Sequence, residues 1–388
     1  MKKRAIAAVL ALVMASSLAA CGGGSSAPAA TTAAPAATTA APAATTAAAA
    51  ETKAAAETQA AAETKAEAPA AGGDYTPTGK NIVFKVGHVQ PVDHPYHTGL
   101  VRTNELLTER TGGEITLDIY PSSQLGAERE LCEGVQMGTV DIGLTTSPLA
   151  NFDNSWFLFD IPGLFYTKQH AYDFLDGERG QAMLDGLAKI NMKGLSFWET
   201  GFFNIFDDER LIEKPEDLAG LTIRTMENDA YITYFSKLGA NPVPMAYSEV
   251  FTGIQNGTVD GTLIPIAAIY SMKFYTVAPY ISRTQNWYCP VTVIMSMDAW
   301  NSMNEEQQKI FQECFNEGRD YMRQQLTDNE DAQIAQMESE GCTVLDIDKA
   351  AWREAEAEAV QAVKDQFVGK YVSQDDIDYI AELGKKYQ

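Results

Sequence analysis

Short apolar runs rich in β-branched residues alternate with longer stretches of helical periodicity from residue 82 onward. The pattern predicts strands at 82–86 and 115–120, and helices at 96–109 and from about 127 to 138. Strands that alternate with helices in this way are typical of an α/β fold.

One helix-to-strand corner occurs twice in the chain. Residues 133–141 (EGVQMGTVD) return 119 residues later as 252–260 (TGIQNGTVD). Gly138 and Gly257 stand where each helix is expected to end, because glycine adopts a positive φ at little cost. One copy in each of two similar lobes accounts for the repeat, and two facing lobes enclose a cleft.

Residues 303–341 have helical periodicity almost throughout, with Gly318 as a candidate bend and Gly341 as the end. At 1.5 Å per residue such a helix is about 55 Å long, which exceeds one lobe. We therefore expect it to span both lobes. A strand at 342–347 and mostly helical residues 349–386 complete the chain.

The N-terminus has the features of a secretory signal. Three basic residues precede an apolar and small-residue run over 5–20. That run is too short and too rich in alanine for a stable membrane span, which needs about 20 predominantly apolar residues. Residues 18–21 (LAAC), followed by three glycines, resemble the lipobox of bacterial lipoproteins, which implies a lipid on Cys21. An ordinary secretory cleavage is the alternative.

Residues 21–79 consist mainly of Ala, Thr, Pro, Gly and Glu, a composition that cannot build a core. We interpret them as a flexible tether with an average reach of about 40 Å. The remaining residues, 80–388, are numerous enough for two lobes. The expected division is a first lobe of roughly 80–200 plus 290–325 and a second of roughly 201–289 plus 326–388.

The net charge of −23 falls on residues 80–388, because the basic signal and the acidic tether cancel. Nucleic acid and anionic membrane surfaces are bound through clustered Lys and Arg, so neither is an expected partner. Four further cysteines are widely spaced, without metal-ligand spacing. Buried free thiols are the favoured interpretation and disulfides the alternative for Cys132, Cys289, Cys314 and Cys342.

Several stretches closely resemble the extracytoplasmic binding subunits of TRAP transporters, the DctP-type family. They are 214–224 (KPEDLAGLTIR), 256–261 (NGTVDG), 265–275 (PIAAIYSMKFY), 121–126 (PSSQLG) and 160–165 (DIPGLF). The resemblance extends in order over about 82–345. It implies two α/β lobes with strand crossovers, a shared long helix, closure around a small organic acid without a cofactor, and delivery to a sodium-driven permease.

Arg224 ends the apolar run that begins at Leu221, where an α/β strand delivers a side chain to the crevice at the sheet's carboxyl edge. A guanidinium can hold a carboxylate bidentately there. The resemblance implies that Arg224 is the carboxylate clamp. A surface ion pair is the alternative.

Two positions depart from the family pattern. Phe203 stands where members commonly carry a second Arg, and Ile264 where they often carry Asn before a helix-opening proline. Apolar walls leave extra hydroxyls and carboxylates unpaired. The departures favour a monocarboxylate with an apolar or aromatic body.

Further candidates for the cleft are less specific. Ser147 follows a strand that ends near Leu144, and Asn228 lies just beyond Arg224, where capping the next helix is the favoured role. Aromatic candidates, each of which is equally explained as core, are Trp198, Tyr231, Trp287 and Tyr288.

Three of the four histidines gather near one aspartate, at His88, Asp93, His94 and His97. The spacing is not a zinc signature, so we expect no metal. Asp93 is expected to cap the following helix, with Pro95 in its first turn. His88 is the histidine expected to line the cleft.

The favoured function is a non-enzymatic, monomeric receptor anchored by its lipid to the outer face of the cell membrane. A receptor that feeds a sensor kinase would use the same lobes. An exported hydrolase is less favoured, because the chain has no Gly-x-Ser-x-Gly or His-Glu-x-x-His element.

Overall fold

The computed structural model describes residues 75–387. The signal sequence, Cys21 and the tether as far as residue 74 lie outside the described residues. Residues 75–79, which we assigned to the tether, lie against the domain: Tyr75 is buried and its hydroxyl donates to Glu114 Oε2 at 2.5 Å. Within 75–387 no helix is both long and apolar enough to cross a bilayer.

The described chain forms two mixed β-sheets, which confirms the predicted two-lobed α/β class. The first sheet, in spatial order, contains β2 (Ile115–Tyr120), β1 (Ile82–Gly87), β3 (Ile142–Thr145), β10 (Tyr288–Ser296) and β4 (Met192–Phe202). The second contains β11 (Thr343–Asp346), β9 (Tyr280–Arg283), β5 (Asn204–Asp207), β8 (Gly261–Ile264), β6 (Thr222–Thr225) and β7 (Asn241–Pro244). In each sheet parallel strands carry antiparallel neighbours.

We call the first sheet with its covering segments the first lobe, and the second sheet with its covering segments the second lobe. Two strand crossings, which lie side by side, connect the two lobes. β4 passes into β5 through Phe203, and β9 passes into β10 through residues 284–287. The crossings are hydrogen-bonded to each other, since Phe203 N donates to Trp287 O (2.8 Å) and Gln285 N donates to Phe203 O (3.0 Å). Phe203 is thereby fixed at the hinge.

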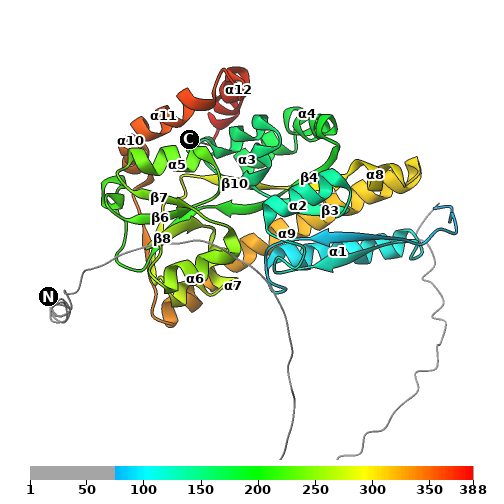
Figure 1. The fold of residues 1–388 in the computed structure, drawn as a ribbon, viewed down its shortest axis with the longest axis horizontal. Helices are drawn as coiled ribbons and strands as arrows, with labels where there is room; N and C mark the ends of the chain where they lie inside the picture. The colour runs from blue at the N-terminus through cyan, green and yellow to red at the C-terminus, as the bar shows by residue number, and fades with distance from the viewer. Residues whose placement is uncertain (1–74, 388) are drawn as a thin grey trace, which may run out of the picture. The chain divides into compact units, whose positions relative to one another are not determined.

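Helices cover both sheets (Figure 1). The first lobe carries α1 (Pro95–Arg110), α2 (Glu128–Met137), α3 (Lys168–Leu175), α4 (Glu178–Gly186) and α8 (Met297–Asn301). The second carries α5 (Asp229–Lys237), α6 (Val250–Gln255) and α7 (Ile266–Ser271). The final helices pack on α5 of one lobe and α3 of the other; they are α10 (Lys349–Ala355), α11 (Ala357–Phe367) and α12 (Gln374–Gly384).

Short 3₁₀ turns complete the connections between these elements. They are η1 (Ser147–Asn151), η2 (Asn154–Asp160), η3 (Leu187–Ile190), η4 (Pro215–Leu218), η5 (Tyr247–Glu249) and η6 (Phe274–Thr276).

The repeated sequence forms the same corner in both lobes, as predicted. Gly138 after α2 and Gly257 after α6 have φ of 74° and 67°. Thr139 N donates to Gly134 O (2.9 Å), and Thr258 N donates to Gly253 O (2.8 Å). The two corners lead into β3 and β8, one strand of each sheet.

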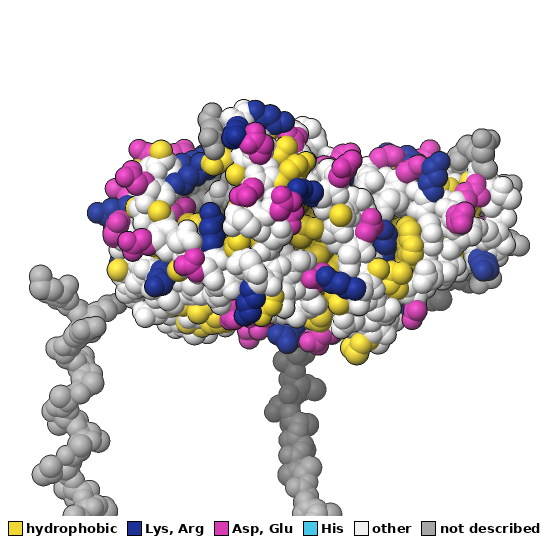
Figure 2. Space-filling model, turned by 90° about the horizontal axis from the view of Figure 1, so that it is seen from above, with side chains coloured by type: hydrophobic (Ala, Val, Ile, Leu, Met, Phe, Trp, Pro, Cys, Tyr) yellow, Lys and Arg dark blue, Asp and Glu magenta, His cyan; other side chains and the backbone are white. Residues whose placement is uncertain are grey.

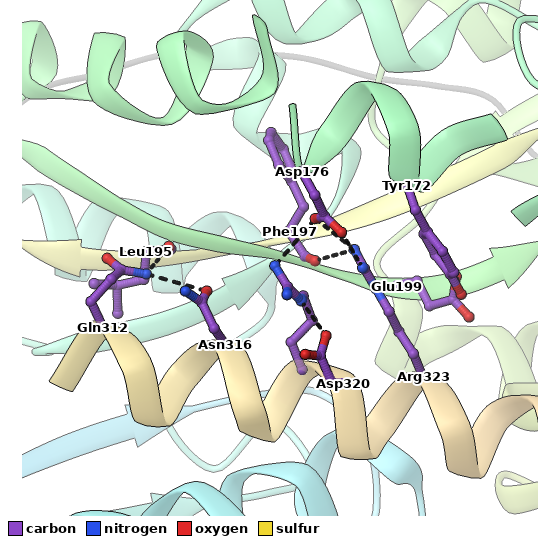
Figure 3. Close-up of polar contacts among 10 residues, drawn as sticks. Tyr172, Asp176, Leu195, Phe197, Glu199, Gln312, Asn316, Asp320 and Arg323 are labelled. Atoms are coloured by element: carbon purple, nitrogen blue, oxygen red, sulfur yellow. Dashed lines mark hydrogen bonds and ion pairs between the residues drawn. The ribbon is translucent and has the colours of Figure 1, made fainter. Parts of the chain in front are cut away.

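The long helix is α9 (Glu305–Ser339), which contacts α1 and β4 of the first lobe and α7 and β11 of the second. Figure 3 shows how polar side chains fix it along β4. Gln312 Nε2 donates to Leu195 O (2.6 Å), and Arg323 donates to Phe197 O (2.8 Å) while pairing with Asp176 (2.6 Å). The predicted helix that spans both lobes is therefore present.

Gly318 does not end or interrupt α9; it lies where α9 and α1 approach closely. A Cβ at this position would lie 1.9 Å from Thr103 Oγ1 and 3.1 Å from the carbonyl oxygen of Gly99. Thr103 Oγ1 itself is held by a hydrogen bond to that carbonyl (2.9 Å). The glycine is required by packing.

Acidic and basic side chains are interspersed over the face shown in Figure 2, so on this face the negative charge does not gather into one patch. The four cysteines within 75–387 are buried free thiols.

We predict that Gly318→Ala lowers the free energy of unfolding by about 1–3 kcal/mol, because the added methyl group meets Thr103 at the contact between two packed helices. Urea denaturation measures the change. Gly186→Ala is the matched control, since a Cβ at that helical glycine meets nothing within 4 Å; it should be neutral or stabilising by up to about 1 kcal/mol. Equal effects of the two substitutions would contradict the packing role.

Candidate functional site

A cleft lies between the two lobes, and its empty space, open solvent included, is ≈ 620 Å³. The first lobe contributes Gln90, Tyr96, Ala127, Glu128, Arg129, Thr146, Pro148 and Thr200. Hinge and second-lobe residues supply Phe203, Arg224, Met226, Glu227, Met245, Ala246, Tyr247, Leu263, Ile264, Pro265 and Ala268.

The carboxyl ends of parallel strands from both sheets meet at this cleft. Gln90 follows β1, Thr146 follows β3, Met226 follows β6 and Pro265 follows β8. Ligands of α/β sheets bind at this edge, because loops after the strands can be varied without disturbing the sheet. The repeated corner described above delivers β3 and β8 to opposite walls.

Arg224 is the buried cation of the cleft. It lies on β6 and is 3% exposed, and its Nε donates to the carbonyl oxygen of Met245 at 2.9 Å. Burial lowers the pKa of Arg224 to about 10, and the negative charge of Glu128 partly opposes the shift. Among residues 75–387 no carboxylate lies within ion-pair distance of its guanidinium. The cleft therefore presents a charged group without a direct counterion.

Glu128 is the acidic side chain of the cleft lining whose charge affects Arg224 most. It is the first residue of α2, where a carboxylate is favoured by the helix dipole. Its Oε2 accepts from Thr146 N at 2.9 Å and from the Thr146 hydroxyl at 2.5 Å. Burial raises the pKa of Glu128, and these hydrogen bonds together with the charge of Arg224 act in the opposite direction.

The rest of the second-lobe wall is largely apolar. Phe203, Leu263 and Ile264 are buried, and Met226 and Met245 extend the same surface. Both departures from the family pattern, Phe203 and Ile264, therefore line the cleft, as does Arg224.

Three polar contacts join the walls at the margin of the cleft. The Tyr247 hydroxyl donates to Gln90 Oε1 (3.0 Å), Asn151 Nδ2 donates to Glu227 O (3.2 Å), and the Thr146 hydroxyl lies 3.7 Å from Met226 Sδ. The lobes are thus in contact around the space that they enclose.

Ser147 and Asn228 do not line the cleft; they meet behind it at the buried carboxyl group of Asp160. The Ser147 hydroxyl and Asn228 Nδ2 both donate to that carboxyl, the second at 2.6 Å. Asn228 Oδ1 also accepts from Ala230 N at 2.8 Å, so Asn228 caps α5 as the sequence indicated. The Tyr231 hydroxyl lies 3.1 Å from the Ser147 hydroxyl.

The candidate tryptophans likewise lie outside the cleft lining. Trp198 packs in the first-lobe core, with a ring-to-ring distance of 6.4 Å to Phe315. Trp287 stacks on Tyr231 at 4.1 Å, and its indole donates to the carbonyl oxygen of Phe159 at 3.2 Å. Tyr288 donates to the buried Glu199 at 2.7 Å.

The histidines of this cluster cap a helix or contact one another. His94, not Asp93 as predicted, caps α1: its Nδ1 accepts from Tyr96 N at 3.1 Å. His88 is buried and does not line the cleft. Its Nε2 lies 3.2 Å from Nδ1 of His97. Burial lowers the pKa of His88 and of His94 to about 3, so both are neutral. Within 75–387 no group of His, Cys, Asp and Glu is placed to hold a metal ion.

A cleft between two α/β lobes, crossed by paired strands and lined by a buried cation, defines a solute-binding protein. The chain belongs to the bacterial extracellular solute-binding protein family 7, DctP, whose model matches residues 86–366. The relatives whose function is named are solute-binding proteins, and the chain is not an enzyme.

Named relatives are similar over most of their length. The 2,3-diketo-L-gulonate-binding periplasmic protein YiaO of Escherichia coli is 32% identical over 70% of this chain and 83% of its own. A TRAP periplasmic solute-binding protein from Polaromonas, bound to D-erythronate, is 32% identical with a TM-score of 0.73, covering 79% of this chain and 99% of its own. A Bordetella protein whose ligand density is interpreted as pantoate is 30% identical with a TM-score of 0.74, covering 78% and 99%.

We predict that Asp160 makes stability fall as pH rises. Burial raises the pKa of Asp160 from 3.8 to about 7. Its contribution to the free energy of unfolding is complete below about pH 4 and is lost as pH rises to about 7, because the folded carboxyl group keeps a proton that the unfolded one releases. Calorimetry should show that, as pH rises from 5 to 7, the melting temperature of Asp160→Asn falls less than that of the wild type.

Asp365→Asn, which alters an exposed carboxyl group, is the control and should follow the wild type. The proposed titration would be wrong if Asp160→Asn kept the wild-type pH dependence.

Proposed function

We propose that this chain is a receptor for a small monocarboxylate with an apolar or aromatic body. Arg224 holds the carboxylate, and Phe203 and Ile264 contact the body. The observation that carries the proposal is the buried guanidinium of Arg224, which faces the cleft without a carboxylate at ion-pair distance within 75–387. An anionic ligand supplies that counterion through charge-assisted hydrogen bonds.

The charges of the cleft favour one carboxylate over two. Arg129, the other cation of the lining, is exposed and pairs with Glu133 at 3.3 Å. Glu128 adds a negative charge beside Arg224. A second carboxylate in the interior would meet Glu128 and the apolar wall, and burying it there without a partner costs several kcal/mol.

The named relatives agree with an organic-acid ligand. D-erythronate, which is bound in one related structure, and pantoate, to which the density of another is assigned, each carry a single carboxylate. The family relationship supports delivery of the captured acid to a TRAP-type membrane permease. We propose that the receptor acts as a monomer. Ser147, His88, Asn228, Trp198 and Trp287 would then support the cleft from behind rather than contact the ligand.

We predict that Arg224→Met removes most of the stabilisation that a bound ligand gives. Binding to the native state adds RT ln(1 + [L]/Kd), about 2.7 kcal/mol at a hundredfold excess over Kd. A panel of pantoate, 4-methylpentanoate, phenylacetate, succinate and D-galacturonate should raise the melting temperature of the wild type only for the first three acids. Arg224→Met should lose about a hundredfold in affinity, while Arg210→Ala, at an exposed arginine 3.6 Å from Glu209, should leave binding unchanged.

Phe203→Arg tests the basis of this selectivity, because it adds the second cation that family members commonly carry. The variant should gain succinate binding. Full affinity in Arg224→Met would overturn the carboxylate clamp, and strong succinate binding by the wild type would overturn the monocarboxylate preference.

We also propose that residues 1–20 are a cleaved signal, that Cys21 carries the lipid, and that residues 21–74 tether the two lobes to the outer face of the cell membrane. An acyl anchor and a flexible linker would keep the cleft near its permease while leaving it free to reorient.

The full chain expressed in a lipoprotein-processing bacterium should fractionate with membranes, and mass spectrometry should find an acylated N-terminal peptide that begins at Cys21. Cys21→Ser should appear in the soluble fraction. An unmodified Cys21, or a mature chain that starts elsewhere, would contradict the anchor.

A further inference from the structure

The described chain begins with a segment, residues 75–79, that binds one carboxylate of the first lobe. Glu114 Oε2 accepts from the Tyr75 hydroxyl (2.5 Å), from Thr78 N (2.9 Å) and from the Thr78 hydroxyl (3.1 Å). Glu114 Oε1 accepts from Gly79 N. Five consecutive residues thus direct four donors at one side chain, and we call them the docking segment.

Gly79 gives the docking segment the backbone shape that this binding needs. Its φ is 75°, in the left-handed region that glycine adopts at little cost. Two successive backbone N–H groups, of Thr78 and Gly79, then point at the same carboxylate, as they do where a backbone nest holds an anion. Burial opposes the change, but the hydrogen bonds from Tyr75, Thr78 and Gly79 lower the pKa of Glu114, which favours its ionised form.

Tyr75 adds a second contact, at the start of α9. Its side chain is buried, and its hydroxyl accepts from Gln307 Nε2 at 3.0 Å. Gln307 is fixed in turn, because its Oε1 accepts from Asn304 N (3.0 Å) in the cap of α9. Burial and the hydrogen bond to Glu114 raise the pKa of Tyr75 to about 12, so the hydroxyl keeps the proton that it donates. The docking segment is therefore bound at two elements of the first lobe.

Both contacts lie at the end of the first lobe that faces away from the second lobe. Glu114 directly precedes β2, at the amino edge of the first sheet, whereas the cleft lies at the carboxyl edge, about 20 Å away along a six-residue strand. Along α9, about 35 Å separate Gln307 from Glu330, which pairs with Arg283 of the second lobe at 3.0 Å. Figure 1 shows the start of the described chain, in blue, beyond the end of α1 that lies away from β6 and β7.

We propose that the docking segment joins the preceding tether rigidly to the first lobe alone, so that the first lobe is the held lobe of the anchored receptor and the second is the lobe that moves. The statement about the anchored receptor rests on the proposed lipid on Cys21, whereas the docking does not. Tension on the tether then enters the domain at Glu114 and Gln307. It does not pass through the strand crossings, so the anchor does not oppose opening or closing of the cleft.

Hydrogen exchange of individual amides tests the docking. In the wild-type chain the amides of residues 78 and 79 should exchange at least about tenfold more slowly than in an unstructured peptide, because they donate to a charged group. Glu114→Gln removes the charge, and Gly79→Ala strains the left-handed backbone, so each should raise both exchange rates about tenfold. Glu109→Gln is the matched control, since Glu109 is an exposed acid in the same surface depression as Tyr75; it should leave both rates unchanged.

Distances between pairs of spin labels test which lobe is held. One pair, Thr76→Cys with Glu105→Cys, joins the docking segment to α1 of the first lobe, and the other, Thr76→Cys with Lys237→Cys, joins it to α5 of the second; all three positions are exposed. Cys21→Ser is the background, because the other four thiols are buried. The first pair should give a narrow distance distribution that Glu114→Gln broadens. The second should be wider, since it includes the motion of the second lobe.

The docking would be overturned by wild-type amides that exchange at the unstructured rate, by rates that neither Glu114→Gln nor Gly79→Ala changes, or by a broad first-pair distribution. A second-pair distribution as narrow as the first would overturn the assignment of the second lobe as the moving one. Both measurements use chains whose outcome does not depend on the lipid. An unmodified Cys21 in the fractionation experiment would therefore refute the anchor and leave the docking intact.

Discussion

The burial of one guanidinium is the constraint on which the cleft depends. Arginine cannot discard its charge at physiological pH, and even in this environment the pKa of Arg224 stays near 10. Its position is fixed by β6 and by the Met245 carbonyl, while its nearest compensation, Glu128, belongs to the other lobe. A charge buried in this way favours a closed cleft that holds an anion over a closed cleft that is empty, because the anion provides the counterion that the protein lacks.

Much of the architecture could be predicted from the sequence because its determinants are local. The repeated Gly-Thr-Val-Asp corner signals a left-handed glycine after a helix, and both copies have that geometry. Arg224 could be placed at the cleft because it ends a short apolar run that becomes β6. Phe203 and Ile264 could be placed there only through the family pattern, since nothing in their own neighbourhood distinguishes a cleft wall from core.

The first-lobe side of the site escaped prediction because it is assembled from distant segments. Tyr96 and Glu128 each begin or adjoin a helix, and their spacing in sequence carries no recognised motif. Glu128 could have been noticed as an acidic residue opening α2 directly after the Gly126 turn. Ser147 and Asn228 were expected among the ligand-binding residues of the cleft, yet both turn toward Asp160, a buried acid whose position follows from the packing of η2 against α5.

The close approach of Gly318 to Thr103 has a mechanical consequence. That contact with α1 and the bonds of Arg323 to Phe197 and Asp176 tie α9, as far as Arg323, to the first lobe. Any opening motion that preserves them moves the whole helix with the first lobe. The C-terminal part of α9, which lies against α7 and β11, must then slide or pivot against the second lobe, so a small rotation at the paired strand crossings becomes a larger displacement at the far end of the helix.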